Sequence, residues 1–276
     1  MHESDRDSEG FYVLHRKYST LYKKVNYTAP VTMVQNRITE YDIHSANLSM
    51  LRTYRKLKPS TIDDLESLPK HDRQVIIGKL QREDPSIKKV IAKGIIHAKE
   101  MLFQENGIQD EDVLSIKNDA VFVIGRKLKK TTFGEFIEFR VKNTFSLYLQ
   151  LDKIEYYYDK ANDHVVIKGI KDSVLEDPDI QAGMMNFFRT IMKYLCYDRR
   201  DKVREYLIEF SDAYKKKKLP IQYYKELSGS CVYRTNLIQI GNYSLNLAVA
   251  TDADREHVLG TYNYRRFVIP FIQAFQ

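Results

Sequence analysis

Cysteine is scarce in this sequence of 276 residues, and tryptophan is absent. The two cysteines, Cys196 and Cys231, lie far apart and show none of the spacings typical of metal sites, which argues against a cysteine-based metal centre. We interpret them as reduced thiols of an intracellular protein.

Long apolar runs are also missing. No stretch approaches the roughly 20 residues that a membrane-spanning helix needs. The first ten residues, MHESDRDSEG, are polar and lack the apolar core of a signal peptide. The sequence therefore predicts a soluble protein with no membrane partner, located in the cytoplasm, or in the cytoplasm of the host cell if the protein is viral. Internal repeats and low-complexity linkers are absent as well.

Acidic residues are outnumbered by basic ones, 37 to 44, which gives a formal net charge of +7 and favours a polyanionic partner. Twenty tyrosines and thirteen phenylalanines supply rings that serve either for core packing or for stacking on bases. For any single ring, core packing is the simpler interpretation. The length suffices for one large domain or two small ones, with a sizeable core.

The segment Val113–Gly125, VLSIKNDAVFVIG, carries the clearest candidate for a functional carboxylate. β-Branched and aromatic residues on both sides of Asn118-Asp119 predict a tight β-hairpin. Such a hairpin presents the Asp119 carboxylate from a rigid, mostly buried base, which suits a metal ligand. The same pattern also occurs in plain surface turns, so this alternative stays open.

Asp42 stands at a second such position. The segment VTMVQNRITEY (31–41) predicts a strand, and the residues after it change to a helical period that ends before Pro59. Asp42 is thus expected at a strand-to-helix junction, where backbone amides at the helix start can receive an anion. A helix-capping role for this carboxylate is the alternative.

The remaining periodicity predicts an α+β fold, in which an antiparallel sheet backed by helices precedes a mainly helical, basic C-terminal part. Helical patterns cover 60–68, 70–83, 85–106, 179–197 and 201–214, and strand-like patterns cover 134–141, 144–151, 153–158, 164–168 and 236–240. We divide the chain into a catalytic domain, 1–175, and a C-terminal region, 176–276.

Two carboxylates presented by one sheet, with cationic helices beside them, match the needs of phosphoryl transfer. Such a pair can hold Mg²⁺ ions about 3.5–4 Å apart for an in-line displacement. Lysines and arginines nearby would neutralise a triphosphate.

The residues around Asp42 resemble motif A of the palm domain in family B DNA polymerases of viruses and phages. YDIHSANLSML (41–51) is similar to DxxSLYPS, with Asp42 at the metal-binding Asp and Ser45 at the Ser. Asn47 stands where that family has a tyrosine, and Ala46 where it has a leucine. The resemblance implies a metal site at Asp42 and Ile43, and a nucleotide site that includes Ser45 and Asn47.

The hairpin segment resembles motif C of the same family. VLSIKNDAVFVI (113–124) is similar to VLYGDTDSVFVI, with Asp119 at the second Asp, which is the indispensable metal ligand there. Lys117 falls on the first Asp, so that carboxylate is missing, and we assign Lys117 to the nucleotide site. The catalytic pair implied is Asp42 and Asp119.

Between these segments, KHDRQVIIG (70–78) is similar to motif B, KxxxNSxYG. Lys70 falls on the triphosphate-binding lysine, and we assign Arg73 to the same nucleotide site. Gln74 and Ile77 replace the usual Asn and Tyr, which makes this the weakest of the motifs.

Farther along, IEYYYDKANDHVVIKGIKD (154–172) resembles the stretch KKRYAG…VKGIE, which contacts the duplex near the primer end. The basic helices that follow would form a thumb. The nucleic-acid-binding residues expected from these segments are Tyr156, Tyr157, Lys168, Arg199, Arg200, Lys202, Lys215 and Lys216.

The resemblance covers about residues 38–172 and implies a compact, template-directed nucleotidyltransferase without an exonuclease domain and with rudimentary fingers at about 52–85. It implies Mg²⁺ or Mn²⁺ as cofactor, nucleoside triphosphates as substrates and primer–template nucleic acid as partner, with further replication proteins as expected partners. Lys117 and the altered motif B favour an alternative, a catalytically degenerate palm that binds nucleic acid or protein. A nuclease is a third possibility, but nucleases generally use more acidic ligands.

Overall fold

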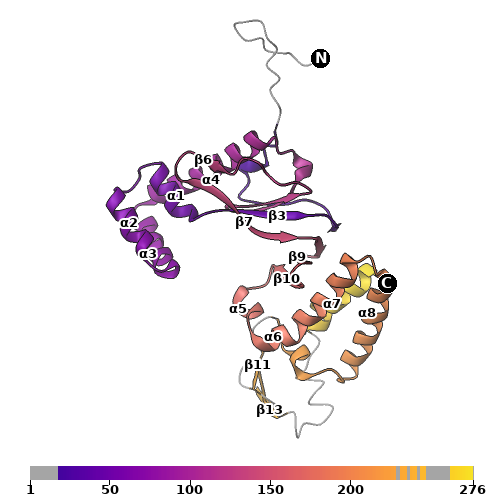
Figure 1. Ribbon diagram of the computed structural model, residues 1–276. Helices are drawn as coiled ribbons and strands as arrows, with labels where there is room; N and C mark the ends of the chain where they lie inside the picture. The colour runs from indigo at the N-terminus through magenta and orange to yellow at the C-terminus, as the bar shows by residue number, and fades with distance from the viewer. Residues whose placement is uncertain (1–17, 228–230, 235–236, 241–242, 247–261, 276) are drawn as a thin grey trace, which may run out of the picture. The chain divides into compact units, whose positions relative to one another are not determined.

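The computed structural model describes residues 18–227, 231–234, 237–240, 243–246 and 262–275, which fall into two compact units (Figure 1). Among these residues, the first unit comprises 18–30 and 38–144, and the second comprises 31–37 and those from 145 onward. The division predicted near residue 175 is therefore wrong. Strands just after residue 145 share a hydrophobic core with the C-terminal helices, and one of them pairs with the segment 31–37.

The first unit is built on a six-stranded sheet in the order β1-β4-β5-β3-β7-β6. Its elements in chain order are η1 (Leu21–Lys23), β1 (Asn26–Thr28), β3 (Ile38–Ile43), α1 (Ala46–Thr53), α2 (Pro59–Ser67), α3 (Lys70–Glu83), α4 (Pro85–Asn106), η2 (Asp110–Asp112), β4 (Val113–Lys117), β5 (Ala120–Ile124), β6 (Thr132–Phe133) and β7 (Ile137–Phe145). The hairpin predicted around Asn118-Asp119 is confirmed, because β4 and β5 pair antiparallel across these two residues.

Helix α4 covers one face of this sheet. Its apolar residues recur at steps of three and four, and those at the helix centre are buried in one cluster with alternate residues of β3 and β5. Tyr41 and Ile43 of β3 belong to that cluster. Because side chains alternate along a strand, Glu40 and Asp42 lie on the face of β3 away from α4. The packing of α4 thus decides which face of β3 is left for chemistry.

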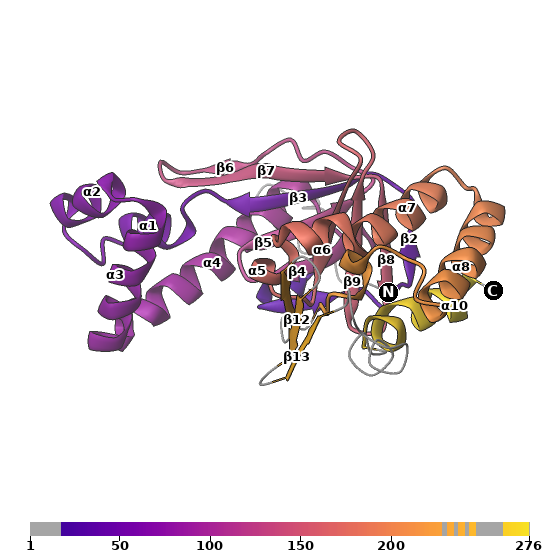
Figure 2. The ribbon, with the colours of Figure 1, turned by 90° about the horizontal axis from the view of Figure 1, so that it is seen from below.

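Helices α1, α2 and α3 gather at one end of the sheet, beyond the C-terminal end of β3 (Figure 2). Arg52 of α1 connects α1 to α2 by ion pairs with Asp63 (2.8 Å) and Glu66 (3.0 Å). The chain then returns along α4 to the hairpin. The start of α3 lies near the C-terminal end of β3, because Lys70 lines the same pocket as Asp42 and Ile43.

The second unit has a four-stranded sheet, β10-β9-β8-β2, packed against helices on one face. Its elements are β2 (Met33–Val34), β8 (Leu147–Leu151), β9 (Ile154–Asp159), β10 (His164–Lys168), α5 (Asp172–Leu175), α6 (Pro178–Ala182), α7 (Met184–Cys196), α8 (Arg200–Lys215), η3 (Ile221–Tyr224), β11 (Cys231–Arg234), β12 (Leu237–Ile240), β13 (Tyr243–Asn246), the π-helix η4 (Tyr264–Val268) and α10 (Ile269–Phe275). Strands β11, β12 and β13 form a small antiparallel sheet of their own.

The predicted fold class is confirmed: antiparallel strands and helices form an α+β protein with a helical C-terminal region. The single helix predicted over 179–197 is instead two helices, α6 and α7, which meet at Gly183. No helix in the described ranges is long and apolar enough to cross a membrane.

Gly183 is required at this junction by its neighbours. A Cβ atom there would lie 2.3 Å from the carbonyl oxygen of Gln222, which is backbone and has little room to move. We therefore expect Gly183→Ala to lower the free energy of unfolding by about 1–3 kcal/mol, measured by chemical denaturation. Gly78 is the control, because no atom lies within 4 Å of a Cβ added in α3. Gly78→Ala should stabilise the protein by about 0.5–1 kcal/mol. Equal effects of the two substitutions would contradict this account.

Candidate active site

Strand register brings the two candidate carboxylates to the same end of the first sheet. Asp42, near the end of β3, is the antiparallel partner of Ala120 at the start of β5. Asp119 is the residue immediately before Ala120, in the turn of the hairpin. The two acids that the sequence singled out are therefore neighbours across adjacent strands, although about 75 residues of chain separate them.

Proximity of the two acids changes the proton affinity of one of them. Burial raises the pKa of Asp119 above its usual range, and the negative charge of Asp42 and a side-chain hydrogen bond between the two carboxyl groups raise it further. Such a pair is under electrostatic strain when both groups are ionised. A bound cation would relieve that strain, so the pair is suited to hold one.

One pocket of about 540 Å³ contains this pair, a size typical of small-molecule sites. Seven of the residues assigned from the sequence to the metal and nucleotide sites line it, namely Asp42, Ile43, Ser45, Asn47, Lys70, Arg73 and Asp119. The structure therefore brings together residues from β3, α1, α3 and the hairpin turn, which are distant in the chain.

Two helices begin at this pocket. Ser45 precedes α1 in the left-handed conformation (φ 48°, ψ 46°), so the chain turns sharply from β3 into the helix. The first amides of an α-helix have no partner within the helix and carry partial positive charge, which favours a bound anion. Lys70 is the first residue of α3. The pocket thus receives the positive ends of two helices.

Helix α3 turns one face toward the pocket. Lys70, Arg73, Gln74 and Ile77 all line it, and their spacing of three, four and seven residues places them on one side of the helix. Throughout the part of the chain that the structure describes, neither the Lys70 nor the Arg73 side chain has an ion pair or a hydrogen bond. Both cations are therefore available to an anionic ligand.

Two further cations of β7 line the pocket but already have partners. Arg140 is paired with Glu138 (2.7 Å). Lys142 lies 3.6 Å from a carboxylate oxygen of Asp42 and 3.7 Å from one of Glu40, which is itself buried. Lys142 thus partly neutralises the acidic side of the pocket.

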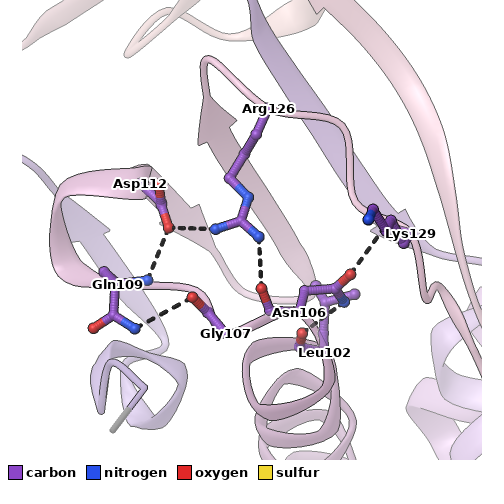
Figure 3. A network of polar contacts seen from close by, with 7 residues as sticks. All are labelled: Leu102, Asn106, Gly107, Gln109, Asp112, Arg126 and Lys129. Carbon is purple, nitrogen blue, oxygen red and sulfur yellow. Dashed lines mark hydrogen bonds and ion pairs between the residues drawn. The ribbon is translucent and has the colours of Figure 1, made fainter. Parts of the chain in front are cut away.

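The hairpin that carries Asp119 is fixed at its base by a polar network (Figure 3). The Arg126 guanidinium donates to the Asp112 carboxylate (2.9 Å) and to the carbonyl oxygen of Asn106 (2.6 Å). Asp112 also accepts from the backbone N–H of Gln109 (2.9 Å). The side-chain oxygen of Asn106 accepts from the backbone N–H of Lys129 (3.0 Å). Because Asp112 precedes β4 and Arg126 follows β5, both ends of the hairpin are tied to the end of α4.

The available ligands suit Mg²⁺ or Mn²⁺, which also bind water and substrate phosphates, better than they suit a metal whose ligands all come from the protein. No group of three or more His, Cys, Asp or Glu side chains that could hold a metal exists among the described residues. Mg²⁺ is usually bound by one or two carboxylates together with waters and substrate phosphates. Asp42 and Asp119 supply the two carboxylates, and Ile43, which the resemblance assigns to the metal site, lines the same pocket.

A profile of a known protein family matches the chain. The profile described as bacteriophage PBS1 gene 130 protein covers residues 17–275, nearly the whole chain. The chain belongs to this family. None of the curated proteins matches it. The viral or phage character expected from the resemblance agrees with a family named after a bacteriophage protein, whose description states no activity.

In this member of the PBS1 gene 130 family, Lys117 does not lie where the sequence placed it. Its side chain points across the sheet and donates to the Thr28 hydroxyl of β1 (3.0 Å), and it is not among the residues that line the pocket. The assignment of Lys117 to the nucleotide site is therefore wrong. The cause is the pairing of β1 with β4, which brings the Thr28 hydroxyl within reach of the Lys117 ammonium.

Tyr156 and Tyr157 were also misassigned as nucleic-acid ligands, because both rings are buried. Tyr156 packs against Phe188 and Phe271, with ring centroids 5.2 Å away in each case. Tyr157 packs against Tyr148 at 5.0 Å, and its hydroxyl donates to Glu155. Neither ring is exposed for stacking on a base.

The cations assigned to the thumb are exposed or half-exposed on the second unit, and most of them have nearby partners. Lys168 lies on β10 opposite Glu155. The others contact their own helix or a neighbouring ring: Arg199 with Asp201, Arg200 with Asp198, Lys202 with Glu205, Lys216 with Asp212, and Lys215 over the ring of Tyr264. Their binding of nucleic acid stays a prediction.

Sequence reasoning missed Lys99, a buried lysine of α4 next to the site. Lys99 is four residues after Ile95 and three before Leu102, so it falls within the apolar stripe of the helix. This spacing was the one feature of the sequence that could have indicated a buried lysine. Burial lowers the pKa of Lys99 to about 8, and the nearby charge of Asp119 opposes this shift.

The lowered pKa of Lys99 predicts a pH-dependent stability. Between about pH 8 and 10.5, the unfolded chain holds a proton that the folded protein has lost, so folding becomes more favourable as the pH rises. We expect the wild-type protein to gain on the order of 2–3 kcal/mol relative to Lys99→Met over this interval. Chemical denaturation of both proteins at pH 7.5 and 10.5 measures the change. A difference that stays constant with pH would show that Lys99 is not the titrating group.

Proposed function

We propose that this protein is a template-directed nucleotidyltransferase that extends a nucleic-acid strand with the help of Mg²⁺ or Mn²⁺. The observation that carries the proposal is the pocket itself. Two neighbouring carboxylates, Asp42 and Asp119, line it together with two cations, Lys70 and Arg73, that have no partner in the described chain. This is the charge arrangement that a metal–triphosphate complex requires.

Resemblance to the palm of family B polymerases supports the same assignment, because residues from each of the motifs A, B and C line one pocket. Asp42 and Asp119 would hold the cation, with the carbonyl oxygen of Ile43. Lys70 and Arg73 would bind and orient the phosphates, aided by the first amides of α1. Bound Mg²⁺ would supply Lewis-acid activation of the attacking hydroxyl and neutralise charge on the phosphates.

Extension of a labelled primer–template tests the proposal. The full chain is incubated with Mg²⁺ or Mn²⁺ and each nucleotide pool in turn, on DNA and on RNA templates. Nucleotide addition that depends on the metal and on the template sequence supports it. Absence of addition on every template and with both metals would refute it, provided that the protein is folded.

A catalytically degenerate palm is the second candidate, and one observation favours it. Lys117 occupies the place of an acidic residue and is directed toward Thr28, and the described residues offer no third acid for a metal. A degenerate palm would bind primer–template nucleic acid or a protein without extending a strand. Binding that is unaffected by Asp42→Asn and Asp119→Asn, with no extension, would support this candidate over the enzyme.

Asn47 is expected to influence which sugar the site accepts. In the resembled family a tyrosine at this position excludes a 2′-hydroxyl, whereas Asn47 is smaller and lines the pocket with an amide that can donate to or accept from a hydroxyl. We expect ready incorporation of ribonucleotides, as in a primase. Asn47→Tyr should shift the preference toward deoxynucleotides by about one to two orders of magnitude. Competing ribo- and deoxynucleotides in the extension assay measure this ratio. Strong deoxynucleotide selectivity that does not respond to the substitution would remove Asn47 from the argument.

A further inference from the structure

Lys99 is a buried lysine whose ammonium group donates to two backbone carbonyl oxygens. Its side chain is on the covered face of α4, with the residue only 1% exposed. The ammonium donates to the carbonyl oxygen of Lys24 (2.6 Å) and to that of Asn118 (3.0 Å). A methionine would fill the same volume without the cost of burying a charge. The distinct contribution of the lysine is therefore its pair of hydrogen bonds.

One of these hydrogen bonds is made to the turn that carries Asp119, and the other to the residue before Val25, which contacts the same turn. Asn118 adopts the left-handed conformation (φ 57°) at the hairpin tip, and its N–H donates to the carbonyl oxygen of Val25 (2.7 Å). The carbonyl that Lys99 holds lies in the peptide plane that ends at the nitrogen of Asp119. Lys24 and Val25 come from the segment that leads into β1. The tip is thus held between this segment and α4.

We propose that Lys99 is a positioning residue that fixes the orientation of the Asp119 carboxylate by anchoring the peptide group before it. The hairpin then has two anchors, the network of Arg126 and Asp112 at its base and Lys99 at its tip. The consequence for metal binding rests on the proposed function, whereas the consequence for the hairpin tip does not. Partners of metal ligands that act in this way typically change metal affinity by about 10–100-fold.

Lys99→Met in the full-length protein tests the inference with two measurements. Hydrogen–deuterium exchange of the peptide covering 116–121 reports on the tip, and calorimetric titration with Mn²⁺ reports on the carboxylate pair. We expect exchange at the tip to increase and Mn²⁺ affinity to fall by about 10–100-fold. Lys99→Gln, whose amide can still donate to a carbonyl, should give intermediate values for both.

Two variants of the same helix serve as controls. Lys93→Met removes an exposed lysine of α4, and Ile91→Val weakens the packing of its buried face. Both should leave exchange at the tip and Mn²⁺ affinity unchanged, even where Ile91→Val lowers the melting temperature. If Lys99→Met unfolds the chain, Lys99→Gln carries the comparison.

The two measurements separate the inference from the function on which it rests. Unchanged exchange at the tip in the Lys99 variants overturns the inference, whatever the metal does. Increased exchange together with unchanged Mn²⁺ affinity also overturns it, if Asp119→Asn abolishes Mn²⁺ binding. If Asp119→Asn leaves Mn²⁺ binding intact, the proposed function fails, and the exchange at the tip alone decides whether Lys99 positions Asp119.

Discussion

Asp119→Asn is expected to reduce nucleotide addition by about three orders of magnitude or more, while making the metal-free protein more stable at neutral pH. Asparagine preserves the shape of the side chain but removes the charge that attracts a divalent cation, and such ions contribute several kcal/mol to phosphoryl transfer. The same change removes an unfavourable interaction, because Asp119 is partly buried and lies beside Asp42. Asp42→Asn should reduce nucleotide addition equally.

The sign of the stability change follows from the pKa of Asp119. Its pKa is raised in the folded protein, so the fold favours the protonated carboxyl, and this contribution to stability is lost as the pH rises through the folded-state pKa. Asparagine does not ionise and incurs no such loss. Asp119→Asn should therefore melt a few degrees higher than the wild-type protein at pH 7 without metal, and the difference should shrink as the pH is lowered.

Thermal unfolding with a chelator over a series of pH values measures the stability, and single-nucleotide extension measures the activity. Mg²⁺ should raise the melting temperature of the wild-type protein and leave that of Asp119→Asn unchanged, because only the former binds the ion. Asp64→Asn, an exposed acid on α2, is the control and should change neither quantity. Full activity of both Asp42→Asn and Asp119→Asn would refute the polymerase assignment.

Removal of the two unpaired cations of α3 should weaken nucleotide binding more than any other change outside the carboxylate pair. Lys70 and Arg73 line the pocket, and charge-assisted hydrogen bonds to phosphate are worth about 1.5–3 kcal/mol each. We expect Lys70→Met and Arg73→Met each to raise the KM for the nucleoside triphosphate by about 10–100-fold. The double variant should lose more affinity than either single variant.

Unfolding of α3 would not explain such a loss. Lys70 is at the first position of the helix, where a positive charge is unfavourable for the helix dipole, so its removal should stabilise the helix slightly. Lys79→Met removes an exposed lysine of the same helix that does not line the pocket, and its KM should equal that of the wild-type protein. A KM that rises equally in all three single variants would point to a general charge effect.

Much of the local structure could be predicted because it depends on short stretches of chain. The hairpin at Asn118-Asp119 follows from apolar, β-branched flanks around a two-residue turn, and α4 follows from apolar residues at three- and four-residue steps. The position of Asp42 near the end of a strand that leads into α1 follows from the change of period beside it. These are properties of neighbours in the sequence.

The misassigned residues share a physical cause. Alternation along a strand shows that its two faces differ, but not which face another element covers. Tyr156 is buried because helices pack on its face of β9, and Tyr157 because it packs against Tyr148 and Phe145. Lys117 does not reach the site because β1 pairs with β4 and Thr28 accepts its hydrogen bond. The boundary between the units moved for a similar reason, since the two-residue strand β2 pairs with β8, more than a hundred residues later.

The sequence by itself therefore determined the elements, the two acids and the cations that flank them. Only the tertiary structure decided that Asp42 faces Ala120 across β3 and β5, and that Lys70 and Arg73 of α3 line the same pocket. It also decided that Lys99 of α4 lies beneath the turn before Asp119. Strand register and helix packing are set by the burial of apolar surface summed over many distant residues, and no local pattern encodes that sum.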